Sequence, residues 1–282
     1  MAFLLLDEFQ IIFNNYLDRR LKEISCEKEF NDLLGYTPQS GGKRLRPYII
    51  YLLSNALGLP QAVYMELGLG VELFHSGSLI QDDLPSLDND DFRRGRPSLH
   101  KYCGEGSAML IADYLMLYPG KIFLALPLSA KAILNLLKLW YEASLQVIEG
   151  EFFDVNIKAK KMEEIEKVHR LKTASLFGFC FSAPFVCAER FLEAFEMNKA
   201  GIDFGRAFQI FDDIKDKLGK SETLGKTPGK DEAQNRPSIL KHMKVEDAKG
   251  YAERLYSKAL EKIKQNEVRK ALITVRELIE EH

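Results

Sequence analysis

Residues 82–97 read DDLPSLDNDDFRRGRP and combine five carboxylates with three guanidiniums, the acidic block first and the basic block second. Oxygen ligands clustered in this way suit a hard cation such as Mg2+, and neighbouring arginines suit phosphate oxygens. The alternative is a solvated turn, because runs rich in Asp and Asn beside Pro and Gly commonly form turns. Taken alone, the stretch leaves both interpretations open.

A second acidic motif lies far downstream, at Asp212, Asp213 and Asp216. Asp212 and Asp216 are four residues apart, so an α-helix would place them on one face. Their neighbours Phe211 and Ile214 are apolar, and ionised carboxylates beside a core face are costly unless a cation or hydrogen bonds compensate. This context favours a metal site over an acidic surface turn.

The two acidic motifs are expected to face each other. Asp82 and Asp88 are six residues apart, a spacing that would point them to different sides of an uninterrupted helix. Pro85 breaks a helical hydrogen-bond ladder, so the first motif is predicted where a helix ends and a loop lets both carboxylates converge. Two helices facing each other across a metal–diphosphate best explain the pair of motifs.

Two basic clusters provide candidate anion ligands. The first follows Gly41-Gly42, and glycine permits close approach of the backbone to an anion. Arginine forks in both clusters give bidentate phosphate contacts, although a solvated basic loop is the alternative for the first cluster. A nearby histidine, His75, lies on an apolar segment, where a buried core histidine is more common than a ligand. The clusters are Lys43, Arg44 and Arg46, and Arg93, Arg94 and Arg96.

Composition excludes several classes of protein. The 282 residues are 46% hydrophobic and 28% charged, a balance typical of globular proteins, and the net charge of −2 provides no basic field for nucleic acid. The four cysteines lack CxxC spacing, which indicates buried thiols in a reducing compartment. No signal peptide and no membrane span is expected, because the longest apolar region is interrupted by Pro127, Lys131 and Lys138. We therefore expect a cytoplasmic protein.

Helical periodicity extends along the chain, whereas alternating β-branched runs with hairpin turns are missing. The predicted helix 62–81 delivers the first acidic motif, and the predicted helix 198–218 carries the second. Pro119-Gly120 is predicted to stop the helix that begins at Ala108, and Pro184 to kink or break another. No linker or repeat divides the chain. We predict an all-α fold with one domain over residues 1–282.

Six ordered motifs resemble those of the trans-isoprenyl diphosphate synthases, the farnesyl and geranylgeranyl diphosphate synthase family. The resemblance covers about residues 41–236, and although each motif alone is weak, their order makes a chance match improbable. It implies an all-α bundle around a deep central cavity (the isoprenoid synthase fold), usually in a homodimer. The motifs are Gly41-Gly42-Lys43-Arg44-Leu45-Arg46-Pro47, Asp82–Asp88, Arg93-Arg94-Gly95, Lys172-Thr173, Phe208–Asp216 and Leu224-Gly225-Lys226-Thr227.

The resemblance implies a prenyltransferase that condenses isopentenyl diphosphate with dimethylallyl or geranyl diphosphate. The implied Mg2+ ligands are Asp82, Asp83, Asp88, Asp212, Asp213 and Asp216. The residues implied for the allylic diphosphate are Arg93, Lys172, Thr173, Gln209 and Lys226. Those implied for isopentenyl diphosphate are Gly42, Lys43, Arg46, His75 and Arg94. The catalytic residues would be Lys172, Arg93, Asp82 and Asp212.

The implied chemistry requires no protein base. The allylic C–O bond breaks, and metal ions, lysine and arginine stabilise the diphosphate that leaves. The isopentenyl double bond attacks the carbocation, and the departed diphosphate takes the proton. Water has to be excluded from the cation, and residues 219–236 are the candidate lid.

Product length depends on side chains near the first motif. In the family, the residue five positions before the first Asp helps to form the floor of the product tunnel. Here it is Gly77, which would deepen the tunnel and favour C20 or longer, whereas Phe74 and Tyr114 would shorten it. We favour farnesyl diphosphate (C15), with a geranylgeranyl diphosphate synthase as the alternative. Two more distant alternatives are a terpene cyclase, which would not need the isopentenyl site, and a non-catalytic synthase subunit, which often lacks one acidic motif.

Overall fold

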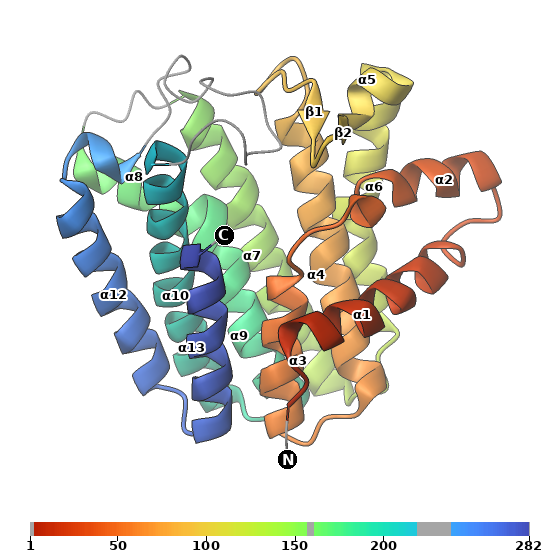
Figure 1. The fold of residues 1–282 in the computed structure, drawn as a ribbon. Coiled ribbons are helices and arrows are strands. Elements are labelled where there is room, and N and C mark those ends of the chain that lie inside the picture. The colour runs from red at the N-terminus through yellow and green to blue at the C-terminus, as the bar shows by residue number, and fades with distance from the viewer. Residues whose placement is uncertain (1–2, 157–160, 219–237, 282) are drawn as a thin grey trace.

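The computed structural model describes residues 3–156, 161–218 and 238–281, and most of them lie in helices (Figure 1). The predicted all-α fold is therefore confirmed. The N-terminal helices are α1 (Leu6–Leu21), α2 (Lys28–Tyr36), η1 (Pro38–Ser40), α3 (Leu45–Ala56) and α4 (Gln61–Asp82). The middle helices are α5 (Leu99–Cys103), α6 (Glu105–Leu124), α7 (Ala130–Asn156), α8 (Met162–Val168), η2 (His169–Ala174) and α9 (Ser175–Cys187). The C-terminal helices are α10 (Phe191–Leu218), η3 (Ile239–Lys241), α12 (Val245–Glu261) and α13 (Asn266–Glu281).

Helix α9 lies at the centre of the bundle, and all thirteen of its residues are buried. A helix that is apolar on every side satisfies its whole surface only inside a core. It packs against α10, α7 and α3, while α4 packs against α6 and α3, and α10 also contacts α12. Figure 1 shows α4 and α6 on one side of the bundle and α10 and α12 on the other. The helices that carry the two acidic motifs, α4 and α10, thus belong to opposite halves.

The predicted helix end at Pro119 was wrong, and the helix at Pro184 does not break. Helix α6 continues through Pro119 to Leu124, and α9 continues through Pro184 to Cys187. A proline inside a helix removes one hydrogen bond and crowds the preceding turn, but both prolines here are buried. Pro119 lies against α4 at Gly70, so packing against a neighbouring helix compensates for the lost bond.

A short hairpin follows the first acidic motif, although no strand was predicted. Strand β1 (Phe92–Arg93) pairs antiparallel with β2 (Arg96–Pro97). Both residues between them, Arg94 and Gly95, have positive φ, as hairpin turns of type I′ require. Strands of two residues are too short to show alternation in a sequence. The hairpin turns the arginines back toward the body of the bundle.

Among the described helices, α6 alone is long and apolar enough to cross a membrane by length and composition, and half of that segment is buried inside the protein.

Candidate active site

The first acidic motif folds back on itself where α4 ends, as the spacing predicts. The Asp88 backbone N–H donates to the Asp82 carbonyl at 2.9 Å, and the Asp90 N–H donates to the Asp83 carbonyl at 3.2 Å. These two bonds bring residues six and seven positions apart side by side. Asp88 is buried and Asp82 is partly exposed. Both can therefore converge on one ligand.

Asp83 has a different partner from its neighbour. Both of its oxygens accept from Arg93 Nε, at 3.0 and 3.1 Å, and its Oδ1 also accepts from Arg93 Nη2. Burial raises the pKa of the Asp83 carboxyl, and the hydrogen bonds from Arg93 partly offset that rise. In this structure Asp83, predicted as a metal ligand, holds Arg93 at the edge of the site.

The second acidic motif divides in the same way. Asp212 and Asp216 are exposed near the end of α10, whereas the Asp213 side chain turns inward. Its Oδ2 accepts from Ser238 Oγ and from the Ile239 N–H, both at 3.1 Å. Asp213, also predicted as a metal ligand, thus joins α10 to η3.

Thr173 and Gln209, predicted to hold the allylic diphosphate, belong to a hydrogen-bond chain that ends at Asp213. Thr173 Oγ1 donates to Gln209 Oε1 at 2.7 Å, and Gln209 Nε2 donates to Asp213 Oδ1 at 3.0 Å. The chain connects η2 with α10. It fixes the position of the neighbouring lysine, Lys172, relative to the second acidic motif.

Lys172 lies among carboxylates from two other helices. Its Nζ is 2.5 Å from Glu151 Oε2 and 2.6 Å from Asp154 Oδ2. Although burial alone would lower the pKa of Lys172, the charges of Asp82, Asp154 and Glu151 raise it well above its usual value. Burial raises the pKa of Glu151 to about 7, and the charge of Asp82 adds to that rise. Asp82 of α4, Glu151 and Asp154 of α7 and Lys172 of η2 therefore surround one position.

The backbone makes this meeting possible at Gly150. A Cβ there would lie 2.2 Å from the Lys172 backbone nitrogen, so α7 and η2 touch at a distance that only glycine permits. The segment η2 is a π-helix, a rare form that occurs often at functional sites. Sequence reasoning assigned no role to Gly150, Glu151 or Asp154. Their signal was the acidic end of an otherwise apolar helix.

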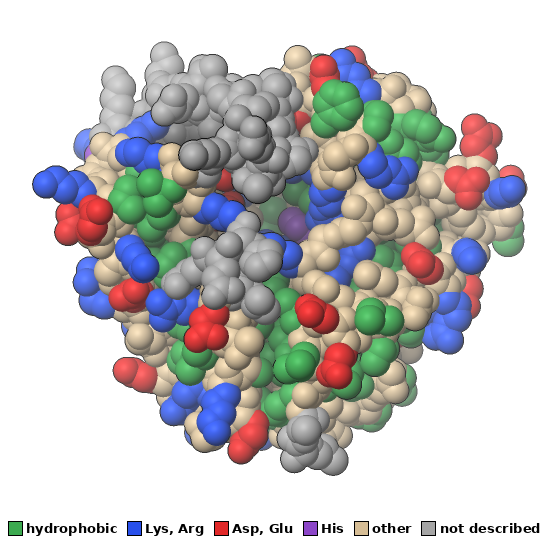
Figure 2. Space-filling view, in the orientation of Figure 1, with side chains coloured by type: hydrophobic (Ala, Val, Ile, Leu, Met, Phe, Trp, Pro, Cys, Tyr) green, Lys and Arg blue, Asp and Glu red, His purple; other side chains and the backbone are tan. Residues whose placement is uncertain are grey.

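The basic residues gather round His75. Burial, followed by the charges of Arg46, Arg94, Arg93 and Arg44, lowers the pKa of His75 well below its usual 6.5, so the ring is neutral at pH 7. An anion that binds between like charges held together in this way lowers the repulsion between them. Figure 2 shows Lys and Arg side chains and a histidine beside a hollow in this face of the protein.

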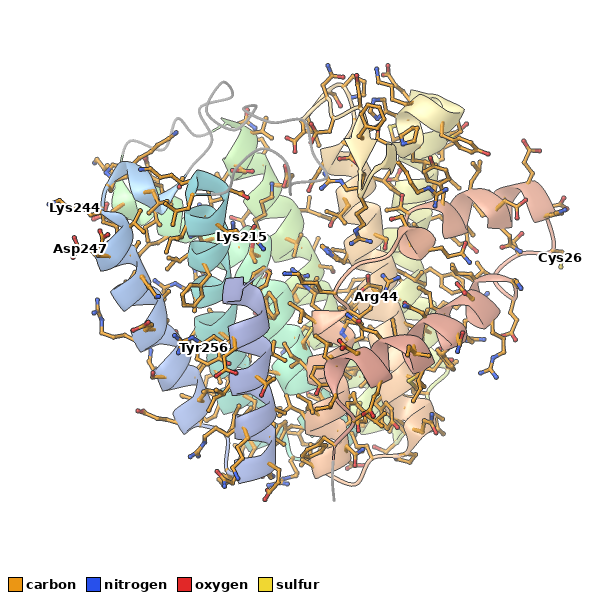
Figure 3. The ribbon with its side chains drawn as sticks, viewed as in Figure 1. Cys26, Arg44, Lys215, Lys244, Asp247 and Tyr256 are labelled. Carbon is orange, nitrogen blue, oxygen red and sulfur yellow. The ribbon has the colours of Figure 1, made fainter. Side chains whose placement is uncertain are left out.

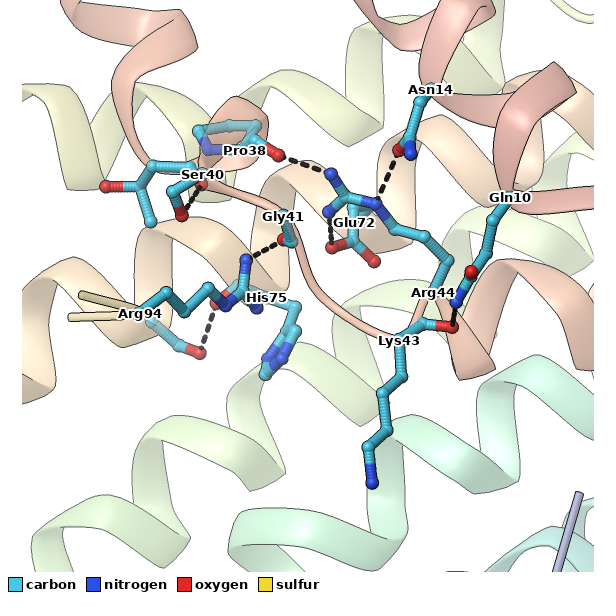
Figure 4. A network of polar contacts seen from close by, with 12 residues as sticks. Gln10, Asn14, Pro38, Ser40, Gly41, Lys43, Arg44, Glu72, His75 and Arg94 are labelled. Carbon is cyan, nitrogen blue, oxygen red and sulfur yellow. Dashed lines mark hydrogen bonds and ion pairs between the residues drawn. The ribbon is translucent and has the colours of Figure 1, made fainter. Parts of the chain in front are cut away.

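The loop after Gly41 approaches the hairpin closely. The Arg94 guanidinium donates to the Gly41 carbonyl and lies 2.8 Å from where a Cβ on Gly42 would be (Figure 4). Gly42 also has φ of +126°, so both its backbone conformation and the nearby guanidinium require glycine at this position. The predicted pair Gly42 and Arg94 is thus brought together.

Arg46 and Lys43 lie toward the second acidic motif. Arg46 stacks on the Phe177 ring at 4.6 Å, and its buried Nε has no hydrogen-bond partner within the described part of the chain. Burial and the charge of Lys215 lower the pKa of Lys43, while Asp212 opposes them, so these groups lie near one another. Figure 3 shows Lys215 at the upper end of α10 and Arg44 on the side of α1.

The whole arrangement offers an arginine-rich anion site beside carboxylates from α4 and α10. The sequence matches the polyprenyl synthetase family over residues 27–275. The chain belongs to the polyprenyl synthetase family. The synthase is 36% identical to the farnesyl diphosphate synthase of Bacillus subtilis over 222 residues, which cover 76% of this chain and 75% of the relative. Other relatives, 29–30% identical, bear the name geranylgeranyl synthase.

Solved structures show the same fold. A geranyltranstransferase from Thermotoga maritima superposes with a TM-score of 0.83 at 30% identity, covering 97% of this chain and all of that one. A geranyltransferase from Helicobacter pylori, complexed with magnesium and isoprenyl diphosphate, gives a TM-score of 0.82 at 25% identity, covering 100% and 99%. The predicted isoprenoid synthase fold is confirmed, and the synthase is a short-chain prenyltransferase of the geranyltranstransferase type.

Two of the residues expected to set product length, Gly77 and Tyr114, lie at contacts between helices. A Cβ on Gly77 would meet Met116 Cγ at 2.7 Å and the Ala112 carbonyl at 2.9 Å, so this glycine brings α4 close to α6. The Tyr114 ring lies 5.1 Å from Phe30 of α2, with an edge-to-face geometry. Tyr114 thus packs against α2, and its expected role as the tunnel floor stays a prediction.

Phe74 lies in a buried cluster of aromatic side chains. It is 1% exposed, and its ring lies 5.1 Å from Trp140, edge to face. Trp140 contacts Phe123 and Phe179 in the same way and closes this part of the core with aromatic rings. Lys226 and the predicted lid at residues 219–236 lie outside the described residues.

Proposed function

We propose that the synthase joins isopentenyl diphosphate to geranyl or dimethylallyl diphosphate and releases farnesyl diphosphate. The observation that carries this proposal is the cluster of Arg46, Arg93 and Arg94 round the neutral His75, with Arg93 hydrogen-bonded to Asp83 of the first acidic motif. A diphosphate binds both kinds of group, the arginines directly and the carboxylates through a divalent metal. The relative that was solved with magnesium and isoprenyl diphosphate supports the assignment.

Mg2+ fits the carboxylates of the two acidic motifs, which the resemblance assigns to the metal. Within residues 3–156, 161–218 and 238–281, no group of three or more His, Cys, Asp or Glu side chains is close enough to hold a metal alone. Mg2+ commonly takes one or two protein carboxylates together with substrate phosphates and water, so a smaller set is what this metal needs. The ligands we propose are Asp82, Asp88, Asp212 and Asp216. When bound, the metal would neutralise charge on the leaving diphosphate.

Arg93 and Lys172 are proposed to hold the allylic diphosphate. Each is already aimed by carboxylates, Arg93 by Asp83 and Lys172 by Glu151 and Asp154. Cations fixed in this way stabilise the negative charge that develops as the C–O bond breaks, without having to reorganise. We assign Thr173, Gln209 and Lys226 to the same diphosphate on the family resemblance.

The second substrate is assigned to the loop that begins at Gly42. We propose that Lys43, Arg46 and Arg94 bind the diphosphate of isopentenyl diphosphate and that the neutral His75 donates a hydrogen bond to it. Its double bond then attacks C1 of the allylic cation to form the new C–C bond. The adjacent C–H bond breaks to form the new double bond, and its proton goes to the released diphosphate.

A C15 product agrees with the packing round Phe74. Gly77 is used to bring α4 against α6, so its small size does not open a deeper tunnel. The buried Phe74, backed by Trp140, provides the obstruction in the chain's path. Both observations favour farnesyl over geranylgeranyl diphosphate.

The experiment is an elongation assay with purified protein, isopentenyl diphosphate, geranyl diphosphate and Mg2+, followed by mass analysis of the dephosphorylated products. We expect farnesol as the main product, and none when EDTA replaces Mg2+. The Phe74→Ala variant should release a larger share of C20 product. Absence of any elongation would refute the proposed function, and a main product of C20 from the wild type would refute the assignment of Phe74.

We further propose a cytoplasmic homodimer built from one domain over residues 1–282. One cluster of buried hydrophobic side chains runs from Leu6 to Val275, which supports a single domain. An apolar stripe remains exposed on α6 and α7, and we call it the α6–α7 stripe. Contiguous exposed apolar surface of this kind marks an interaction site. Its residues are Leu110, Leu117 and Leu124 on α6, and Leu134, Tyr141, Leu145, Ile148, Phe152 and Val155 on α7.

A further inference from the structure

Arg44 differs from the other basic residues of its loop. Its backbone is left-handed, with φ of 51° and ψ of 30°, a conformation that costs a residue with a side chain roughly 1–2 kcal/mol. It is also only 3% exposed, so its charge has been removed from water. Something in the fold has to compensate for both costs. The compensation lies in the contacts of its guanidinium.

Each nitrogen of the Arg44 guanidinium has a partner on a different element (Figure 4). Nε donates to Asn14 Oδ1 of α1 at 2.9 Å, and Nη2 donates to the Pro38 carbonyl of η1 at 2.6 Å. Nη1 donates to Glu72 Oε1 of α4 in a buried ion pair. The side chain therefore joins three helices behind the loop, and because only 1% of it is exposed, it presents no surface to a substrate.

The same loop is held at two more points. Gln10 of α1 donates from Nε2 to the Lys43 carbonyl at 2.8 Å, and Arg94 donates to the Gly41 carbonyl. Figure 4 shows the Lys43 side chain extending away from the one of Arg44. Burying Arg44 on one side thus directs Lys43 to the other side, where the diphosphate is proposed to bind.

Glu72 connects this support to the rest of the cation cluster. It is 3% exposed and lies three residues before His75, on the same face of α4. Its charge attracts the guanidiniums of Arg46 and Arg94 and favours their charged forms. One carboxylate therefore both anchors Arg44 and moderates the repulsion between the neighbouring arginines.

We propose that the buried Arg44–Glu72 ion pair positions the Gly42–Arg46 loop and His75 for the diphosphate of isopentenyl diphosphate. Both are positioning residues, since neither touches the substrate. The inference rests on the proposed function, because that function assigns the loop to isopentenyl diphosphate. It predicts a specific defect: affinity for this substrate falls, and affinity for the allylic substrate does not.

The test compares Glu72→Gln with wild type, varying each substrate in turn. We expect the KM for isopentenyl diphosphate to rise roughly tenfold or more, because displacing a positioned binding group by about 1 Å has effects of this size. The KM for geranyl diphosphate should stay near the wild-type value. Glu66→Gln is the matched control, since Glu66 lies on the same helix and pairs with Arg20 at 2.9 Å on the outer side of α4. That variant should keep both wild-type KM values.

Two additions keep the test decisive. The double variant Arg44→Met/Glu72→Met replaces the buried pair by apolar side chains, a change that proteins commonly tolerate, and it should show the same selective defect. Calorimetric titration with isopentenyl diphosphate alone measures binding without turnover, so it separates failure of this inference from failure of the proposed function. The inference is overturned if both KM values rise together, if neither changes, or if Glu72→Gln binds isopentenyl diphosphate as tightly as wild type.

Discussion

At the scale of single residues, Glu151 is a group whose ionisation the site disturbs. It lies on α7 with Lys172 Nζ 2.5 Å away, yet burial and the charge of Asp82 raise its pKa from the usual 4.5 to about 7. The attraction of the lysine is thus outweighed. A carboxyl whose pKa is raised on folding binds more protons in the native state than in the unfolded state between these two values.

This shift predicts the pH dependence of a variant. Because the native state holds the extra proton, the stabilisation from Glu151 is complete below pH 4.5 and is lost as the pH rises to 7. Glu151→Gln mimics the protonated form at every pH. Its free energy of unfolding should therefore exceed that of wild type by roughly 2–3 kcal/mol at pH 8, with little difference at pH 4.5. The measurement is urea unfolding in EDTA at both pH values.

Glu149→Gln is the control for that experiment, because Glu149 lies two residues away on α7 with its side chain 52% exposed. It should match wild type at both pH values. A stability difference for Glu151→Gln that does not change with pH would show that the carboxyl titrates normally in the folded protein.

Single residues also show where prediction from the sequence stops. The two acidic motifs and the basic loop were recognisable because they are local runs of charge. The division of labour within each motif was not, since it depends on the partners that folding brings to Asp83 and Asp213. These are Arg93, ten residues away, and Ser238, 25 residues away. Spacing on a helix contains no information about such partners.

At the scale of elements, alanine variants of the adjacent residues Asp212 and Asp213 of α10 are expected to differ in stability. Asp213 accepts hydrogen bonds from Ser238 and Ile239 of the η3 segment, so Asp213→Ala leaves both donors without their acceptor. The loss should lower the free energy of unfolding by roughly 1–3 kcal/mol and speed hydrogen exchange over residues 238–241. Asp212→Ala changes an exposed side chain and should leave stability within about 0.5 kcal/mol of wild type.

In activity, the more strongly affected of the two variants is expected to be Asp212→Ala. If Asp212 is a metal ligand, Asp212→Ala should lose most elongation activity and need more Mg2+ for what remains, while its thermal unfolding stays that of wild type. Equal losses of stability in the two variants would contradict the division of roles. So would faster exchange at residues 238–241 in Asp212→Ala.

Element boundaries explain the remaining errors of the sequence-based prediction. The long helices were predicted because apolar residues recur at helical spacing over many turns, and α9 lacks polar faces altogether. Pro119 was expected to end a helix and Pro184 to kink or break one, but both lie buried inside helices, and Pro119 packs against α4 at Gly70. No sequence pattern identifies the π-helix η2, which lies where the backbone of α7 touches it at Gly150. Tertiary contact, and not local sequence, decides such features.

At the scale of the whole molecule, the α6–α7 stripe is the surface that the bundle leaves uncovered. Its positions on α7 recur every three or four residues from Tyr141 to Val155, with Leu134 seven residues before, and this is the spacing of a seam between helices. Tyr141 of α7 reaches Gly120 of α6, so the two halves of the stripe adjoin. A second copy of the chain, related by a two-fold axis, would present the same seam and cover both. The stripe also borders the site, because Phe152 follows Glu151 directly.

Leu145→Glu tests this arrangement in the middle of the stripe. Leu145 is 64% exposed, so the charge would be tolerated by a monomer but would be buried at a dimer interface, where an unpaired carboxylate is costly. We expect light scattering after size-exclusion chromatography to give twice 32.2 kDa for wild type and 32.2 kDa for the variant. Leu192→Glu makes the same change at a leucine that is 89% exposed on another helix, α10, and is not part of the stripe, so this variant should remain dimeric. Because the end of α7 carries both Phe152 of the stripe and Glu151 of the site, the monomeric variant should also lose activity. A monomeric wild type, or a Leu145→Glu variant that stays dimeric, would exclude the stripe as the subunit interface.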